Sequence, residues 1–80
     1  MKLAADISLY PLNETYIPPI DAIIARFESY PEIEVRRNAL STQLFGDYDA
    51  VMQVIHTEMA RSFSENKAVL VVKFVCTDRG

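Results

Sequence analysis

Segment 36–51, RRNALSTQLFGDYDAV, carries four small polar side chains within six positions: Asn38, Ser41, Thr42 and Gln43. Their hydroxyl and amide groups donate and accept hydrogen bonds without carrying net charge. Such groups can hold an uncharged hydrogen-bonding ligand. They can equally build a hairpin, because Ser and Thr pair across strands and Asn38 can form the turn between the strands. The residue types alone leave both interpretations open.

The carboxylate of Asp6 is the second candidate for chemistry. Asp6 lies in the alternating run 3–11, LAADISLYP, on the side opposite the larger apolar residues. A carboxylate on a central strand is costly to bury unless it is paired or contacts a ligand. Arg36 and Asn38 have the parity to share this sheet face, which makes them candidate partners for Asp6. An ion pair that holds the sheet and a role in binding both remain open for Asp6.

His56 and Cys76 are the other side chains with reactive groups. His56 is predicted on the solvent face of a helix, and Cys76 is predicted to be a small apolar residue of a strand. No second His or Cys stands at the spacing of metal ligands, so we expect no metal site and no cofactor. No nucleophile is paired with a base, so we expect no catalysis.

Composition limits the classes of partner. The 80 residues predict one domain, 1–80, and the net charge of −3 argues against nucleic acid, which requires a positive surface. Residues 1–12 contain no apolar signal region, and no apolar run is long enough to cross a membrane. A single cysteine fits a reducing compartment. We therefore expect a cytoplasmic protein with a small-molecule ligand and neither membrane nor nucleic-acid partners.

Hydrophobic periodicity predicts six elements in the order strand, helix, strand, strand, helix, strand. The strands are expected at 3–11, 33–38, 41–46 and 67–76, and the helices at 18–29 and from an Asp47 cap to a break at 64–66. The expected buried stripe of the second helix is Tyr48, Val51, Met52, Ile55, Met59 and Phe63. Two right-handed crossovers then predict an α+β, ferredoxin-like βαββαβ sandwich. Its antiparallel sheet has four strands, the first and third at the centre, and two helices on one face.

The last predicted strand is apolar on both faces. Leu70, Val72 and Phe74 point to one side, and Val69, Val71 and Val75 point to the other. The helices can cover only one side, and an exposed valine patch is typical of an interface. We therefore expect self-association as a dimer or tetramer, sheet to sheet or edge to edge.

Two stretches together resemble a known family. ISLYPL near the N-terminus, followed by ALSTQLFGDYDAVMQVI, is similar to the YkoF-like thiamine/hydroxymethylpyrimidine-binding proteins. The matching positions are Ser8 and Pro11, the pair Ser41–Thr42, and Gly46 before an acidic helix start. The resemblance implies a ferredoxin-like domain that binds thiamine or its pyrimidine moiety, does not catalyse a reaction, and assembles through its open sheet face.

An aminopyrimidine presents ring acceptors and an amine donor in one plane, which suits hydroxyl and amide partners. Tyr10 can stack on such a ring. The expected ligand-binding residues are Asp6, Ser8, Tyr10, Asn38, Ser41, Thr42 and Gln43. Strand alternation places Thr42 on the opposite face from Ser41 and Gln43, so one ligand could contact all three only in a pocket shared between subunits. Gly46 is expected to ease the sharp exit into the second helix.

Two functions from different classes follow from these patterns. The first is a small cytoplasmic carrier or sensor of a thiamine-type ligand. The alternative is a structural or regulatory interaction module, ACT-like, that associates through its open sheet face.

Overall fold

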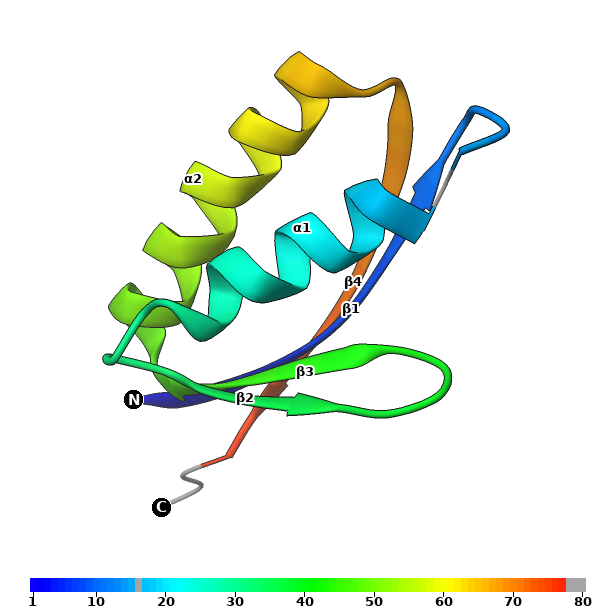
Figure 1. The fold of residues 1–80 in the computed structure, drawn as a ribbon. Coiled ribbons are helices and arrows are strands. Elements are labelled where there is room, and N and C mark those ends of the chain that lie inside the picture. Colours follow the sequence, from blue (N-terminus) through cyan, green and yellow to red (C-terminus); the bar gives the residue numbers. More distant parts are fainter. Residues whose placement is uncertain (16, 78–80) are drawn as a thin grey trace.

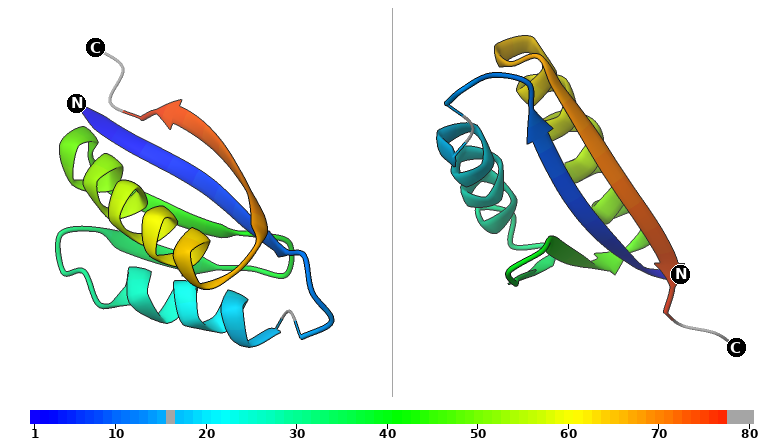
Figure 2. Two further views of the ribbon diagram at one scale, coloured as in Figure 1. Left: turned by 90° about the horizontal axis from the view of Figure 1, so that it is seen from above. Right: turned by 90° about the vertical axis from the view of Figure 1, so that its right-hand side faces the viewer.

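A four-stranded antiparallel sheet carries two helices on one face, as the sequence predicts for a ferredoxin-like sandwich (Figure 1). The structure, a computed structural model, describes residues 1–15 and 17–77. The elements in chain order are β1 (Lys2–Pro11), α1 (Ile17–Glu28), β2 (Glu34–Arg37), β3 (Thr42–Asp47), α2 (Tyr48–Glu65) and β4 (Ala68–Cys76). Figure 2 shows both helices on the same side of the sheet from two further directions.

The strand order is β2-β3-β1-β4, which confirms that the first and third strands are central. β1 pairs with β4 along almost its whole length, from Leu3 opposite Cys76 to Pro11 opposite Ala68. On its other side β1 pairs with β3, from Lys2 opposite Asp47 to Ile7 opposite Thr42. The second half of β1 therefore extends beyond the end of β3 while it remains paired with β4.

The alternation of β1 divides its side chains between the two faces of the sheet. Leu3, Ala5, Ile7 and Leu9 are buried under the helices, while Asp6 and its alternating neighbours lie on the open face. Burial of a large apolar side chain contributes roughly 1.5–3 kcal/mol. The alternation predicted from the sequence is thus correct, and it determines which candidate residues can share a site.

α1 begins where two prolines can be accommodated. Pro18 and Pro19 lie in its first turn, where an amide hydrogen is not needed for the helical bonds. Ile23 and Phe27 face the sheet and are almost completely buried. The helix ends at Glu28, before Pro31, close to the predicted boundary.

The predicted buried stripe of α2 is partly wrong. Its buried residues are Val51, Val54, Ile55, Glu58 and Ser62. Tyr48 and Phe63, which the sequence placed in the stripe, are 43% and 46% exposed. The stripe is rotated because Glu58 points inward to bind α1, which brings Val54 and Ser62 into the interior. The helix ends at Glu65, inside the predicted break.

The predicted capping bond of Asp47 is also wrong. Asp47 is the last residue of β3 and precedes α2, but its side chain makes no capping hydrogen bond. Its carboxylate instead accepts a bond of 2.6 Å from Lys2 Nζ. The reason is the register, because Lys2 lies directly opposite Asp47 on β1.

Gly46 is required for close approach rather than for an unusual backbone angle. It has no positive φ. A Cβ atom there would lie 3.2 Å from Ile33 Cγ2 and 3.3 Å from the Glu32 carbonyl oxygen. We expected a glycine here because it would ease the sharp exit into α2. The structure gives a different reason, namely the tight packing of Gly46 against Ile33 and the Glu32 carbonyl.

β4 is an edge strand, and its exposed apolar face is present as predicted. Val69, Val71 and Val75 are 47%, 46% and 59% exposed. Leu70 and Val72 pack against the core, but Phe74, expected beside them, is 47% exposed. Within the described residues, neither helix has the length and apolar character needed to cross a membrane.

Candidate functional site

A pocket of about 410 Å³ opens between α1, the second half of β1 and the turn that joins β2 to β3. Its apolar lining comes mainly from Ile7, Leu9, Ile20, Ile23, Ile24 and Phe27. Its polar groups come from Ser8, Tyr10, Asn38, Ser41 and Thr42. The structure therefore brings together five of the seven residues that the sequence singled out.

Thr42 is the buried polar residue of this pocket. It is the first residue of β3, lies opposite Ile7 on β1 and is 6% exposed. Its side chain points to the helix side of the sheet, as the alternation predicts. Its hydroxyl makes no hydrogen bond with the part of the chain that the structure describes, namely 1–15 and 17–77. Among residues 1–15 and 17–77, the fully enclosed side-chain oxygen without a partner is Ser62 Oγ on α2, not the Thr42 hydroxyl. The Thr42 hydroxyl instead lines the open pocket, where it is available to a polar ligand.

Asn38 organises the turn at the rim of the pocket. Its side-chain oxygen accepts hydrogen bonds from the backbone amides of Leu40 (3.1 Å) and Ser41 (3.0 Å). Its own backbone amide donates to the Ser41 carbonyl at 3.1 Å. The Ser8 hydroxyl reaches the Leu40 carbonyl at 3.4 Å, which is long for an O–H donor. Asn38 thus forms the turn, which is one of the two roles that the sequence suggested for it. The N–H groups of its side-chain amide can still donate hydrogen bonds to a ligand.

Asp6 and Gln43 lie apart from this pocket, on the open face of the sheet. They line a second hollow of about 350 Å³ together with Phe45, Lys73 and Val75. The predicted site is therefore split between two faces, and no position inside one subunit reaches all seven side chains.

Ser41 links the two faces. It lines the first pocket, and its hydroxyl donates a hydrogen bond of 2.5 Å to Asp6 Oδ1. Lys73 Nζ lies 3.4 Å from the other carboxylate oxygen of Asp6. The Ser41 bond, followed by Lys73, lowers the pKa of Asp6 below its ordinary value. Asp6 is therefore a charged group with a partner on each side, Ser41 in the turn before β3 and Lys73 on β4.

Neither candidate partner is bound to Asp6 directly; Asn38 is connected to it only through the Ser41 hydroxyl, which lies 3.4 Å from Asn38 Oδ1. Arg36 Nε instead donates to Glu34 at 2.6 Å, and its guanidinium carbon lies 4.8 Å from the Phe45 ring centroid. The strand order explains the difference. Arg36 lies opposite Gln43, and Gln43 lies opposite Asp6, so a strand separates the two charged residues.

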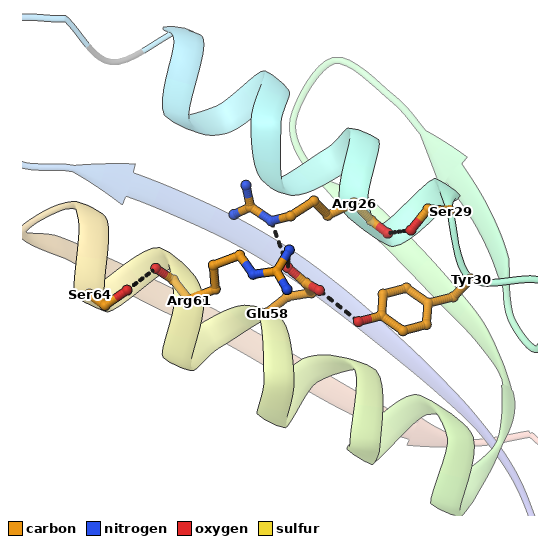
Figure 3. A network of polar contacts seen from close by, with 6 residues as sticks. All are labelled: Arg26, Ser29, Tyr30, Glu58, Arg61 and Ser64. Atoms are coloured by element: carbon orange, nitrogen blue, oxygen red, sulfur yellow. Dashed lines mark hydrogen bonds and ion pairs between the residues drawn. The ribbon is translucent and has the colours of Figure 1, made fainter.

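A buried ionic cluster between the helices is the feature that the sequence analysis missed (Figure 3). Glu58 is 1% exposed and accepts bonds of 2.6 Å from Arg26 Nε and from the Tyr30 hydroxyl. Arg61 approaches Glu58 at 3.9 Å, and the Glu58 bond raises the pKa of Tyr30 above its ordinary value. The sequence signal was Glu58 at the spacing of Val51, Val54 and Ile55. This cluster fixes α1, which forms one wall of the pocket.

The remaining reactive side chains lie away from both hollows. His56 is exposed on α2, as predicted, and Cys76 is the last residue of β4 and is also exposed. Among residues 1–15 and 17–77, no three His, Cys, Asp or Glu side chains are gathered in a way that could hold a metal ion.

Comparison with known proteins gives a likeness of fold. No family model and no curated protein matches the chain. A solved structure of a protein from Streptococcus pneumoniae is similar with a TM-score of 0.89 and 22% identity, covering 98% of this chain and 89% of that one. A "putative thiamine biosynthesis/salvage protein" from Thermotoga maritima is similar with a TM-score of 0.86 and 16% identity, covering 96% and 85%. A hypothetical protein from Methanocaldococcus jannascii is similar with a TM-score of 0.80 and 23% identity, covering 99% and 84%. At these identities the likeness establishes the fold alone.

Proposed function

We propose that this protein binds thiamine or its hydroxymethylpyrimidine moiety without transforming it, as a small cytoplasmic homo-oligomer. The observation that carries the proposal is the pocket under α1, in which the Thr42 hydroxyl has an apolar surround and no partner in the described chain. Small-molecule sites are typically clefts of about 300–1,000 Å³, mostly apolar, with a few placed polar groups. A pocket of about 410 Å³ with this lining fits that description.

The shape of the lining suits a flat ring. Ile23, Ile24 and Phe27 of α1 provide an apolar wall, and Ile7 and Leu9 of β1 provide another. These residues belong to one packed core cluster, so a pyrimidine would lie on the apolar surface that they form and bury one face of its ring there. Its edge would then meet hydroxyl and amide groups that can satisfy ring nitrogens and an exocyclic amine.

The polar groups lie where such an edge would emerge. Thr42 is deepest, while Ser8 and Asn38 lie nearer the turn. Tyr10 lines the same pocket and is 55% exposed, but it shares the parity of Asp6 on the open side of β1. Its ring would therefore stack on a ligand, or face a thiazolium cation, by reaching around the edge of β1 that extends beyond β3. Asp6 and Gln43 would contribute only through Ser41 or through a neighbouring subunit.

Two lines of support come from outside the pocket. The Thermotoga maritima protein of the same fold is named for thiamine biosynthesis or salvage. The motifs ISLYPL and ALSTQLFGDYDAVMQVI resemble the YkoF-like family, and their Ser8, Ser41 and Thr42 all line the pocket.

Self-association is proposed through the open face and edge of β4. Val69, Val71 and Val75 are about half exposed and lie on an edge strand of nine residues. A long apolar edge strand favours pairing with another chain, and a valine face favours burial. This surface also supports the alternative function, an interaction module that associates through its sheet face. In that case the pocket would bind no ligand.

A thermal shift measurement separates these two functions. A ligand at 100 times its dissociation constant stabilises the folded state by about 2.7 kcal/mol. In a domain of this size each kcal/mol raises the melting temperature by roughly 4–8 °C. We expect a clear rise with hydroxymethylpyrimidine or thiamine, and none with uracil as the control ring. No rise with either ligand at millimolar concentration contradicts the binding proposal and favours the interaction module.

A further inference from the structure

The described residues that line the pocket under α1 are all uncharged. Its polar members are hydroxyl and amide side chains, and the rest are aliphatic, aromatic or proline. A charged group moved from water into such a lining loses hydration without gaining an opposite charge. The lining therefore distinguishes between ligands of the same shape that differ in charge.

The basic residues next to the lining in the chain are already engaged. Arg26 precedes Phe27, and its Nε is bound to Glu58 at 2.6 Å. Arg37 precedes Asn38, and it donates two bonds to Glu28, of 2.8 and 3.1 Å. The Glu28 carboxylate raises the pKa of Arg37. An anion in the pocket would have to compete with a carboxylate for either guanidinium.

The backbone near the pocket also lacks the usual means of holding a phosphate. Anions bind helix N-termini through free amide hydrogens, and glycine-rich loops through successive amides. The first turn of α1 contains Pro18 and Pro19, which have no amide hydrogen. The sequence has two glycines, Gly46 and Gly80, and Gly46, the one that the structure describes, lies on β3 and does not line the pocket.

Acidic residues adjoin the lining as well. Asp6, Asp21 and Glu28 each stand next to a lining residue in the chain, and the net charge of the protein is −3. Asp6 and Glu28 are paired with Lys73 and Arg37, so Asp21 and the net charge of −3 leave a field that is mildly repulsive to a phosphate and mildly favourable to a cation. We propose, on the basis of the proposed function, that this pocket selects the unphosphorylated ligand. It takes a neutral heteroaromatic ring and rejects the same ring with a phosphate ester on its hydroxymethyl group.

The test is calorimetric titration of the protein with hydroxymethylpyrimidine and with its monophosphate. We expect the phosphate ester to bind at least about tenfold more weakly, because at the mouth its charge would meet no unengaged cation among the described residues next to the lining and would lie in the field of a protein of net charge −3. Thiamine should bind within about tenfold of the free pyrimidine, since its thiazolium can remain at the mouth beside Tyr10. Equal or tighter binding of the monophosphate overturns the inference.

A pair of variants at the rim makes the test specific to charge. Leu40 lines the pocket and is 89% exposed, so its substitution does not disturb the core. Leu40→Lys should reduce the ratio between the two affinities at least about threefold relative to Leu40→Gln, because it adds a cation where the phosphate would emerge. An unchanged ratio contradicts the electrostatic explanation.

Failure of the proposed function is distinguishable from failure of this inference. If neither hydroxymethylpyrimidine nor thiamine binds, the proposed function is rejected, and benzyl alcohol and benzyl phosphate then probe the pocket itself. The readout is the shift of the Ser8 and Thr42 amide resonances. Larger shifts with the alcohol support selection of uncharged rings, whereas equal or larger shifts with the phosphate refute it.

Discussion

Glu58→Gln is the substitution that most directly probes how the two helices are held together. The change keeps the shape of the side chain and removes its charge. In the wild type the carboxylate is 1% exposed and accepts 2.6 Å bonds from Arg26 and Tyr30. The variant leaves Arg26 without its anionic partner and replaces one carboxylate oxygen with an amide that cannot accept.

The structure sets the size of the expected loss. Removing one partner of a fully buried ion pair costs about 3–5 kcal/mol. Here the Arg26 side chain is 21% exposed and can turn toward water, so the cost is reduced. Hydrogen bonds to charged groups are worth about 1.5–3 kcal/mol, and the glutamine retains part of this. We expect a loss of about 1–3 kcal/mol in the free energy of unfolding, or a melting temperature lower by at least about 4 °C.

Urea unfolding of Glu58→Gln against wild type measures this loss. Glu65→Gln on the same helix is the matched control, since Glu65 is exposed and should change stability by under about 0.5 kcal/mol. A double-mutant cycle with Arg26→Met should give a coupling energy of about 0.5–3 kcal/mol. A Glu58→Gln variant as stable as the Glu65→Gln control, with no coupling to Arg26, would refute the role of the cluster.

Three further predictions concern the surface. Wild-type protein should sediment as a dimer or tetramer at micromolar concentration, and Val71→Asp should dissociate it; a wild-type monomer of 9.1 kDa contradicts the proposed assembly. His56→Ala and Cys76→Ser should leave ligand affinity within a factor of about two, since surface changes usually have small effects, and a tenfold loss by titration would relocate the site. The lowered pKa of Asp6 means that its charged form stabilises the fold fully above the ordinary value of 3.8, and that this contribution is lost as pH falls through the lowered value. Asp6→Asn should therefore be less stable than wild type in urea at about pH 6, and the difference should shrink as the pH is lowered below 3.8; a difference that stays constant contradicts the assignment.

The sequence was sufficient for the fold because its signals are local and periodic. The alternation of β1 and the prolines at the start of α1 give the first crossover. The apolar run of β4 gives an edge strand with an exposed face. These patterns reflect burial and backbone geometry, and both can be read from residues that are close together in the sequence.

The site was only partly predictable because it depends on contacts between distant segments. Sequence indicated the residues of the pocket, including Thr42, but it could not show that Asp6 and Gln43 line a different hollow. The partner of Asp6 followed from strand order, which placed Ser41 within reach and Arg36 beyond a strand.

The same limit applies to the second helix. The apolar pattern of α2 suggested a stripe through Phe63, while the structure buries Glu58 because Arg26 and Tyr30 of the α1 segment satisfy its charge. A charged residue in a buried position is recognised only when its partners are known. Likewise, Asp47 does not form the expected capping bond, because its carboxylate accepts a hydrogen bond from Lys2 on the neighbouring strand.

The central claim is that the pocket holds a pyrimidine through Thr42. Calorimetric titration of wild type and Thr42→Val with hydroxymethylpyrimidine and thiamine tests it most directly, because valine keeps the shape of threonine and removes the hydroxyl. We expect wild-type binding and a loss of about 1–3 kcal/mol in the variant, roughly ten- to hundredfold in affinity. The melting temperature of the two proteins without ligand should be nearly equal, since valine suits a strand as well as threonine does. Equal affinities would move the ligand away from Thr42, and absence of binding to the wild type would contradict the claim outright.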